Sequence, residues 1–204
     1  MNLKNTFTAA ILITLAALSF NADARKYAKF ENDNYTNTAD SIQVAAHGRL
    51  EVAFSPNEGS EKLVVKAIDS ATRELLVLAY SFTSAPVTEA LIRAQKRGVA
   101  VRLVADYKSN ISEDRSGKAR AALAALKNAG ADVRTISVFP IHHDKVIIAD
   151  RNTVELGSFN YSAAAAHFNS ENVIVNFDNP ELAAVYVKHF ERNYGQSEVY
   201  TGQY

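Results

Sequence analysis

The chain has 204 residues, with 22 basic and 22 acidic side chains and no cysteine. The balance of charge excludes a uniformly basic nucleic-acid-binding protein, and the lack of cysteine excludes a small domain held together by disulfides. A chain of this length can bury one substantial hydrophobic core, so we expect a single folded domain.

The first 24 residues have the pattern of a secretory signal peptide. Lys4 precedes an apolar run from Phe7 to Phe20, and Ala22-Asp23-Ala24 fits the small-residue rule for cleavage. We therefore expect cleavage after Ala24 and a periplasmic or secreted protein with no stable membrane association. An uncleaved membrane anchor is the alternative, although the run is short for a membrane span. Cleavage removes one charge of each sign, so the mature chain stays near neutral.

Residues 25–49 are polar and are interpreted as an N-terminal extension of a domain that spans residues 50–204. From residue 50 onward, segments with strand and helix patterns alternate. Apolar runs predict strands at 50–54, 75–82, 99–105, near 133, 146–149 and 153–156. Apolar stripes at helical spacing predict helices at 63–71, 86–97, 119–129 and 182–190. This order predicts an α/β fold with a mixed central β-sheet flanked by helices on both faces.

The most informative pattern lies between His143 and Asn160. It has the spacing H-x-K, four residues, D, six residues, G-S-x-N, formed by His143, Lys145, Asp150, Gly157, Ser158 and Asn160. Such a pattern would arise by chance in a chain of this length on the order of a few times in a million. It combines an imidazole, an ammonium and two neutral hydrogen-bonding side chains, which suits an attack on a phosphodiester without a metal ion.

The predicted strand at 146–149 indicates how the side chains before it point. Because side chains alternate along a strand, His143 and Lys145 should lie on one side, and His142 and Asp144 on the other. The doublet His142-His143 is therefore not expected to bind one metal through both rings. The alternative for His143 is a satisfied core histidine, but this leaves Lys145 on the same face of an apolar strand without a purpose.

The segment Gly157-Ser158-Phe159-Asn160 should turn the chain into a helix that starts near Ser162. Ser158 and Asn160 are then expected near a helix N-terminus, where anions bind. Taken alone, both are ordinary turn residues. The histidine and lysine upstream favour a phosphate-binding role.

In these residues the sequence resembles the phospholipase D superfamily. From about Leu50 to Tyr204 it is similar to the small secreted bacterial endonucleases of that superfamily, which carry one copy of the motif and work as homodimers. The similarity outside the motif includes the segments Ala79-Tyr80-Ser81-Phe82-Thr83, Phe139-Pro140-Ile141 and Ser170-Glu171-Asn172. The resemblance implies a phospholipase D-like fold, a homodimer, and DNA and also RNA as substrates.

The resemblance also implies roles for individual residues. His143 would be the nucleophile, and Glu171 would orient its ring; the alternative is that Glu171 only marks the start of a strand. Asp150 would be a structural residue at the end of a strand. Three side chains would bind the phosphate oxygens: Lys145, Ser158 and Asn160.

The chemistry requires two imidazoles. One attacks phosphorus to give a phosphohistidine, and a second, protonated one gives its proton to the leaving oxygen. Each chain has one motif, so we expect the acid to be His143 of the partner subunit, in a site on a two-fold axis. Lys145 would neutralise charge on the phosphoryl oxygens, and Glu171 would select the tautomer of His143. No step requires a metal, so no metal site or other cofactor is expected.

The remaining histidines and acids are expected to have no catalytic role. His189 falls on the apolar stripe of the last predicted helix and is interpreted as a packing residue. No partner pattern marks His47, His142 or His167. The acids Asp106, Glu113 and Asp114 lack the spacing of metal ligands, and Asp114 resembles a residue at a helix start.

Three function classes follow from these residues. The first is a secreted phosphodiesterase that cleaves DNA, and also RNA, with little sequence preference. The alternative is a phospholipase D-type lipid phosphodiesterase that uses the same site, because the motif binds a phosphate and not what the phosphate joins. The third, a nucleic-acid-binding module without activity, is disfavoured because every chemical position of the motif is filled.

Overall fold

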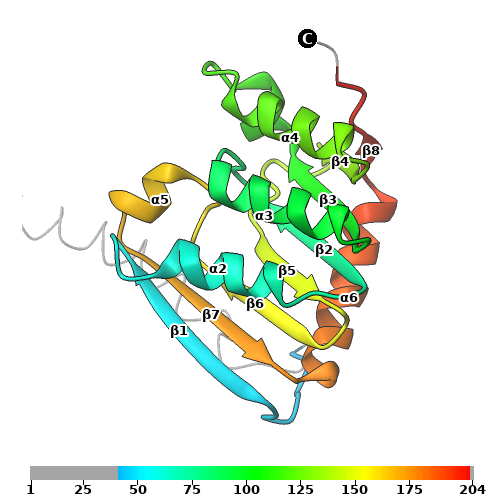
Figure 1. Cartoon of the computed structure of the whole chain (residues 1–204). Coiled ribbons are helices and arrows are strands. Elements are labelled where there is room, and N and C mark those ends of the chain that lie inside the picture. Colours follow the sequence, from blue (N-terminus) through cyan, green and yellow to red (C-terminus); the bar gives the residue numbers. More distant parts are fainter. Residues whose placement is uncertain (1–40, 203–204) are drawn as a thin grey trace, which may run out of the picture. The chain divides into compact units, whose positions relative to one another are not determined.

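The computed structural model describes residues 41–202, in which one compact unit begins at Val44. Within these residues eight strands form one sheet in the order β1-β7-β6-β5-β2-β3-β4-β8 (Figure 1). The strands are β1 (Arg49–Ser55), β2 (Glu74–Ala79), β3 (Ala100–Asp106), β4 (Asp132–Ile136), β5 (Lys145–Ala149), β6 (Thr153–Gly157), β7 (Glu171–Phe177) and β8 (Glu198–Val199). The helices are α2 (Ser60–Asp69), α3 (Ala85–Lys96), the π-helical turn η1 (Lys108–Ser112), α4 (Lys118–Asn128), α5 (Ala163–His167) and α6 (Pro180–Gly195).

The sheet is mixed, as the sequence predicts. Strands β2, β3 and β4 are parallel and are joined through α3 and α4, whereas β5, β6, β7 and β1 follow as antiparallel neighbours. Strand β2 lies near the middle, and its residues 75–79 are completely buried. A strand covered on both faces needs apolar side chains on both, which explains its continuous apolar sequence.

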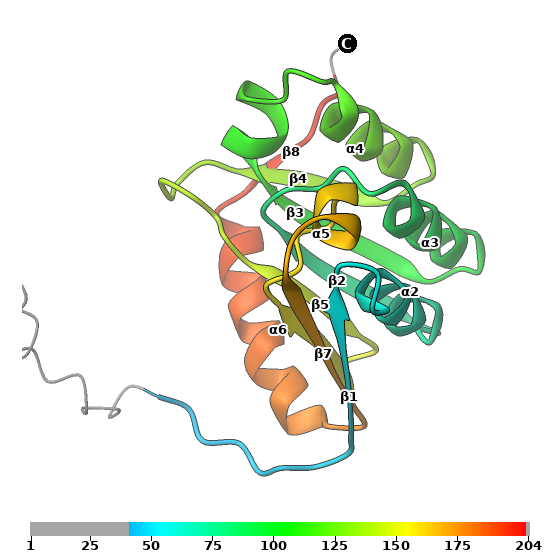
Figure 2. The same ribbon diagram turned by 90° about the vertical axis from the view of Figure 1, so that its left-hand side faces the viewer.

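Helices cover both faces of the sheet, which confirms the predicted fold class. Helices α2, α3 and α4 lie on one face and α6 lies on the other (Figure 2). Leu103 and Leu123 belong to the core under the first group, and Leu76 and Phe190 to the core under α6. Ser84 caps the N-terminus of α3 by accepting a hydrogen bond from the backbone N–H of Val87, so this helix starts where its proline predicts.

One part of the sheet surface is not covered by α6. This helix packs over β2, β4, β5 and β6, while Leu50, Val52 and Phe54 on β1 are each at least 50% exposed. In the sheet register, Leu50 on β1 pairs with Asn176 on β7, and Asn176 pairs in turn with Val154 on β6. Val154 belongs to the core that α6 covers. The three apolar side chains therefore lie on the same face as α6 and extend its apolar surface to the sheet edge.

The motif residues other than Asp150 meet at one end of the sheet. Ala79, at the end of β2, lies opposite Lys145, at the start of β5, and Gly157, at the end of β6, lies opposite Val173 in β7. A Cβ atom at Gly157 would lie 2.2 Å from the carbonyl oxygen of Asn172, so only glycine fits between these two strands. The topology thus explains why the motif has glycine before Ser158.

Several elements differ from the sequence prediction. The turn η1 was not predicted, and strand β7 was anticipated only in the alternative that Glu171 marks the start of a strand. Strand β2 ends at Ala79 rather than at residue 82, because the chain leaves the ladder at Tyr80 and Phe82 forms a bridge with Tyr161. The two-residue strand β8, which pairs with β4, was not predicted because so short a segment has no recognisable period.

The expected signal peptide, residues 1–24, and residues 25–40 of the expected extension lie outside the described residues. No helix within residues 41–202 is long and apolar enough to cross a membrane.

Candidate active site

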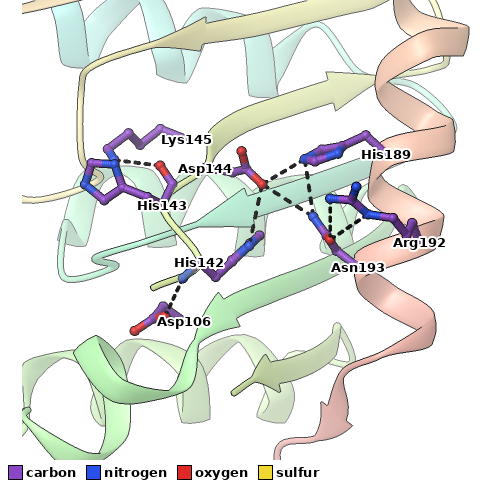
Figure 3. Close-up of polar contacts among 8 residues, drawn as sticks. All are labelled: Asp106, His142, His143, Asp144, Lys145, His189, Arg192 and Asn193. Carbon is purple, nitrogen blue, oxygen red and sulfur yellow. Dashed lines mark hydrogen bonds and ion pairs between the residues drawn. The ribbon is translucent and has the colours of Figure 1, made fainter. Parts of the chain in front are cut away.

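His143 and Lys145 lie side by side at the start of β5. Both side chains point to the same side of the chain, as the alternation predicts, and Asp144 and His142 point toward α6 (Figure 3). The Nζ atom of Lys145 donates a 2.8 Å hydrogen bond to the carbonyl oxygen of His143, whose side chain is exposed. Lys145 is buried, and this burial lowers the pKa of its ammonium group, against the opposing charges of Asp144 and Glu171.

Tyr80 contacts both of these side chains. Its ring centroid lies 4.6 Å from that of His143, and the Nζ atom of Lys145 lies 5.2 Å from the Tyr80 ring centroid. Asn110 holds this part of the chain, because its amide donates to the carbonyl oxygen of Tyr80 at 2.6 Å and its side-chain oxygen accepts from the N–H of Phe82 at 2.9 Å. In the sequence analysis, Tyr80 is only part of a segment that is similar to the endonucleases of the phospholipase D superfamily, and no role is predicted for it.

Ser158 and Glu171 form a second group beside this pair. The Ser158 hydroxyl donates to a Glu171 carboxylate oxygen at 2.6 Å, and the other carboxylate oxygen accepts from the amide of Asn169 at 3.0 Å. Within residues 41–202, no hydrogen bond joins Glu171 to the ring of His143. Glu171 therefore acts here on Ser158 and electrostatically on Lys145, and its orienting role stays a prediction.

Asn160 lies two residues beyond Ser158 and is half-buried. Its side-chain oxygen is buried and has no hydrogen-bond partner among the described residues. The fold thus leaves this acceptor unpaired. Because an unpaired buried polar group is unfavourable, a bound water or another donor that pairs with this oxygen would be favoured.

The predicted helix after the motif is α5, which has five residues. Its N-cap is Ser162, whose hydroxyl accepts from the N–H of Ala165 at 3.2 Å. One N–H group at this terminus is therefore already paired within the helix. The anion site expected at this helix N-terminus stays a prediction, as do the phosphate contacts of the motif side chains.

A network of polar side chains connects residues 142–144 to α6 (Figure 3). An Asp144 carboxylate oxygen lies 2.9 Å from His189 Nε2, 3.4 Å from the Asn193 amide and 3.5 Å from His142 Nδ1. On the other side, a carboxylate oxygen of buried Asp106 accepts from the backbone N–H of His142 at 2.8 Å. Residues 142–144 are thus held both from β3 and from α6.

This network corrects the interpretation of His189 as a packing residue. His189 does lie on the predicted stripe of α6, but its ring is about one-third exposed and hydrogen bonded to Asp144. The periodicity correctly predicts which face of the helix meets the sheet, but it does not show that the Asp144 carboxylate lies opposite His189.

Burial lowers the pKa of His142, against the nearby charges of Asp144 and Asp106, which favours a neutral ring at this position.

Asp150 lies at the other end of β5, far along the strand from His143. One of its carboxylate oxygens accepts from the N–H and hydroxyl of Thr72, and the other from the N–H groups of Arg73 and Glu74, all at 2.8–2.9 Å. These bonds lower the pKa of Asp150 against its partial burial and connect the end of β5 to the start of β2. Among residues 41–202, no cluster of three or more histidine, cysteine or acidic side chains has the arrangement of a metal site.

The site therefore combines an exposed imidazole, an adjacent buried ammonium and a hydroxyl–carboxylate pair at one end of a mixed sheet, an arrangement suited to phosphoryl transfer.

Comparison with known proteins agrees with this chemistry. A family model described as "Cardiolipin synthase, PLD-like domain" matches residues 64–194, and a phospholipase D of Rickettsia conorii is 37% identical over 150 residues, which cover 74% of this chain and 72% of the relative. The chain belongs to the phospholipase D superfamily, and it is a hydrolase that acts on phosphodiester bonds.

The solved structures similar to this one include two whose chains are covered almost completely. The phospholipase D family member Nuc of Salmonella typhimurium is 41% identical, with a TM-score of 0.71, and the match covers 74% of this chain and 97% of Nuc. NucT of Helicobacter pylori has a TM-score of 0.63 at 21% identity and covers 74% of this chain and all of NucT. The second likeness shows the fold, and the first extends to the sequence of the whole domain.

Proposed function

We propose that this protein is a secreted or periplasmic endonuclease that hydrolyses DNA, and also RNA, without a metal ion. The observation that carries the proposal is the pair His143 and Lys145 at the sheet end, with Ser158 and Asn160 of the same motif following in the next turn. The similarity to Nuc supports a nuclease over a lipase, because it spans almost all of that chain and includes segments outside the motif.

The residues have distinct tasks in the proposed reaction. A ring nitrogen of His143 attacks phosphorus, and the bond from phosphorus to the leaving oxygen breaks as that oxygen receives a proton. Lys145 and Asn160 donate to the non-bridging oxygens, and the Ser158 hydroxyl does so once it turns away from Glu171. Water then attacks the phosphohistidine, gives its proton to the second imidazole and releases His143 with a free phosphate end on the product.

The second imidazole is proposed to be His143 of the partner subunit. Each chain contributes one copy of the motif, so a homodimer completes the pair. The uncovered surface of Leu50, Val52 and Phe54 supports association, because three neighbouring apolar side chains on a sheet face are unfavourable in water. Val138, Phe139 and Ile141, directly before the nucleophile, are exposed as well and lie where a second chain would approach.

The alternative is a lipid phosphodiesterase that uses the same residues. It is favoured by the name of the Rickettsia relatives, which are phospholipases D, and by the exposed apolar segment before His143. That segment fits either an acyl chain or a second protein chain, so it does not by itself distinguish the two substrates.

One experiment separates these functions. The mature protein is incubated with supercoiled plasmid, with RNA and with phospholipid vesicles, each with excess chelator and each in parallel with the variant His143→Asn. We expect nicking of the plasmid and shortening of the RNA by the wild type alone, unchanged by the chelator. Release of lipid head groups without cleavage of nucleic acid would establish the alternative. Loss of activity in chelator that magnesium restores would overturn the metal-free mechanism.

A further inference from the structure

Phe168 is the most exposed large apolar side chain among residues 41–202, with 81% of its surface accessible. It follows α5 directly, and its neighbours in the chain are polar: His167, Asn169 and Ser170. An aromatic ring usually buries much of its surface, so a phenylalanine that is almost entirely in water carries a cost in stability. Among the described residues its ring contact is with His167, whose ring centroid lies 6.4 Å away in an edge-to-face arrangement.

The backbone that carries this ring is well anchored. The N–H groups of Phe168 and Asn169 both donate to the carbonyl oxygen of Ala164 at 3.0 Å. On the preceding side, His167 Nδ1 lies 2.9 Å from the side-chain oxygen of Asn57. The exposed position therefore belongs to an ordered turn and not to a loose end, so little conformational entropy is lost when the ring binds a ligand.

The same turn leads directly to the proposed phosphate site. The side chain of Asn169 donates to Glu171, which accepts from the hydroxyl of Ser158. Phe168 and Glu171 are three residues apart, so their Cα atoms are separated by at most about 11 Å. A base attached to the nucleotide next to the bound phosphate can reach this ring.

We propose that Phe168 is a stacking platform for an unpaired base beside the scissile phosphate, and that it gives the enzyme a preference for single-stranded nucleic acid. This inference rests on the proposed nuclease function. A flat ring among polar neighbours suits a base, which has an apolar face and a polar edge. An acyl chain or a membrane surface requires a continuous apolar patch, which this turn lacks. Within a duplex both faces of a base are already stacked, so only unpaired substrate gains the contact.

The first test compares substrates. We expect Phe168→Ala to lower kcat/KM on single-stranded oligonucleotides about tenfold, while Phe168→Tyr, which retains a ring, stays near wild type. Cleavage of a perfectly paired duplex should change less than threefold. Val199→Ala, an exposed apolar residue on β8, is the matched control. Equal losses on both substrates, or no loss on either, would overturn the inference while leaving the nuclease function intact.

The second test uses the absence of tryptophan from the chain. Phe168→Trp, combined with His143→Asn to prevent cleavage, introduces a single tryptophan whose emission can be excited selectively over the nine tyrosines. Stacking predicts that a single-stranded oligonucleotide quenches its emission and that an abasic strand of equal length does not. Equal quenching by both strands would show that bases are not contacted.

Two other outcomes would identify a different occupant. An emission that is blue-shifted without substrate and insensitive to oligonucleotide would show that another protein surface covers the ring. A blue shift only with phospholipid vesicles would show a lipid contact. Each of these outcomes overturns the proposal, and a wild type that cleaves no nucleic acid would overturn the proposed function as well.

Discussion

His143 is the residue on which the proposed chemistry depends. We expect His143→Asn to lower the rate by several orders of magnitude, because an amide cannot form the covalent intermediate, while the fold persists since the ring is exposed. Turnover measured beside a thermal melt tests this. The control is His47→Asn, which alters another exposed imidazole. More than a few per cent of residual activity would show that a different group attacks phosphorus.

His189 is predicted to be a positioning residue, which acts on His143 through Asp144. His189→Leu removes a donor to the Asp144 carboxylate, so we expect kcat to fall about tenfold with little change in KM. His189→Gln retains an N–H donor and should recover most of the loss. Steady-state kinetics of both variants, with Lys188→Ala as the exposed neighbour control, are the measurement. If the Leu and Gln variants behave alike, the hydrogen bond has no part in catalysis.

At the scale of elements, strand β6 contains a completely buried carboxyl group. Glu155 is completely buried in this strand and accepts a 2.8 Å hydrogen bond from the hydroxyl of Tyr161, while its other carboxylate oxygen is unpaired among the described residues. Burial raises the pKa of Glu155 from 4.5 to about 8, although the hydrogen bond from Tyr161 opposes this shift. The folded chain therefore holds a proton that the unfolded chain releases at lower pH.

This difference predicts how stability depends on pH. Because the folded pKa is the higher one, the contribution of Glu155 is most favourable below pH 4.5 and is lost as the pH rises toward about 8. The loss within that window is on the order of 1.4 kcal/mol per pH unit. Glu155→Gln keeps an acceptor for Tyr161 without the charge, so it should be more stable than wild type at pH 8. Denaturant unfolding of both proteins at pH 5 and pH 8 provides the test; parallel pH profiles would show that Glu155 does not hold the proton.

At the scale of the whole molecule, activity is predicted to belong to the dimer. Wild-type chains mixed with His143→Asn chains exchange into heterodimers that lack one imidazole. If one shared site needs both, an equal mixture should have about half the activity per wild-type chain. Mixing with His47→Asn chains, which keep His143, should leave the activity per His143-bearing chain unchanged. A constant activity per wild-type chain in the first series, or full activity of a monomer in sedimentation and dilution assays, would show that one chain is sufficient.

Much of this molecule could be predicted from local patterns. The alternation of strands and helices is determined by apolar periodicity along the chain, and the orientation of His143 and Lys145 follows from the alternation of side chains on one strand. The motif residues are informative for the same reason, since their chemistry and spacing can be read without knowing the strand order. The positions of Ser158 and Asn160 near Lys145 also follow from a short hairpin, which leaves the chain few alternatives.

Contacts between distant segments were decided only by the tertiary structure. His189 and Asp144 are 45 residues apart, and a helical stripe cannot show which polar group lies opposite it. The position of Tyr80 against His143 depends on where β2 leaves the sheet, and the exposure of Leu50, Val52 and Phe54 depends on which strands α6 covers. The sequence alone determined the fold class and the motif because both are local along the chain. Strand order, the network around Asp144 and the exposure of Phe168 are properties of packing, in which residues far apart in the chain compete for the same space.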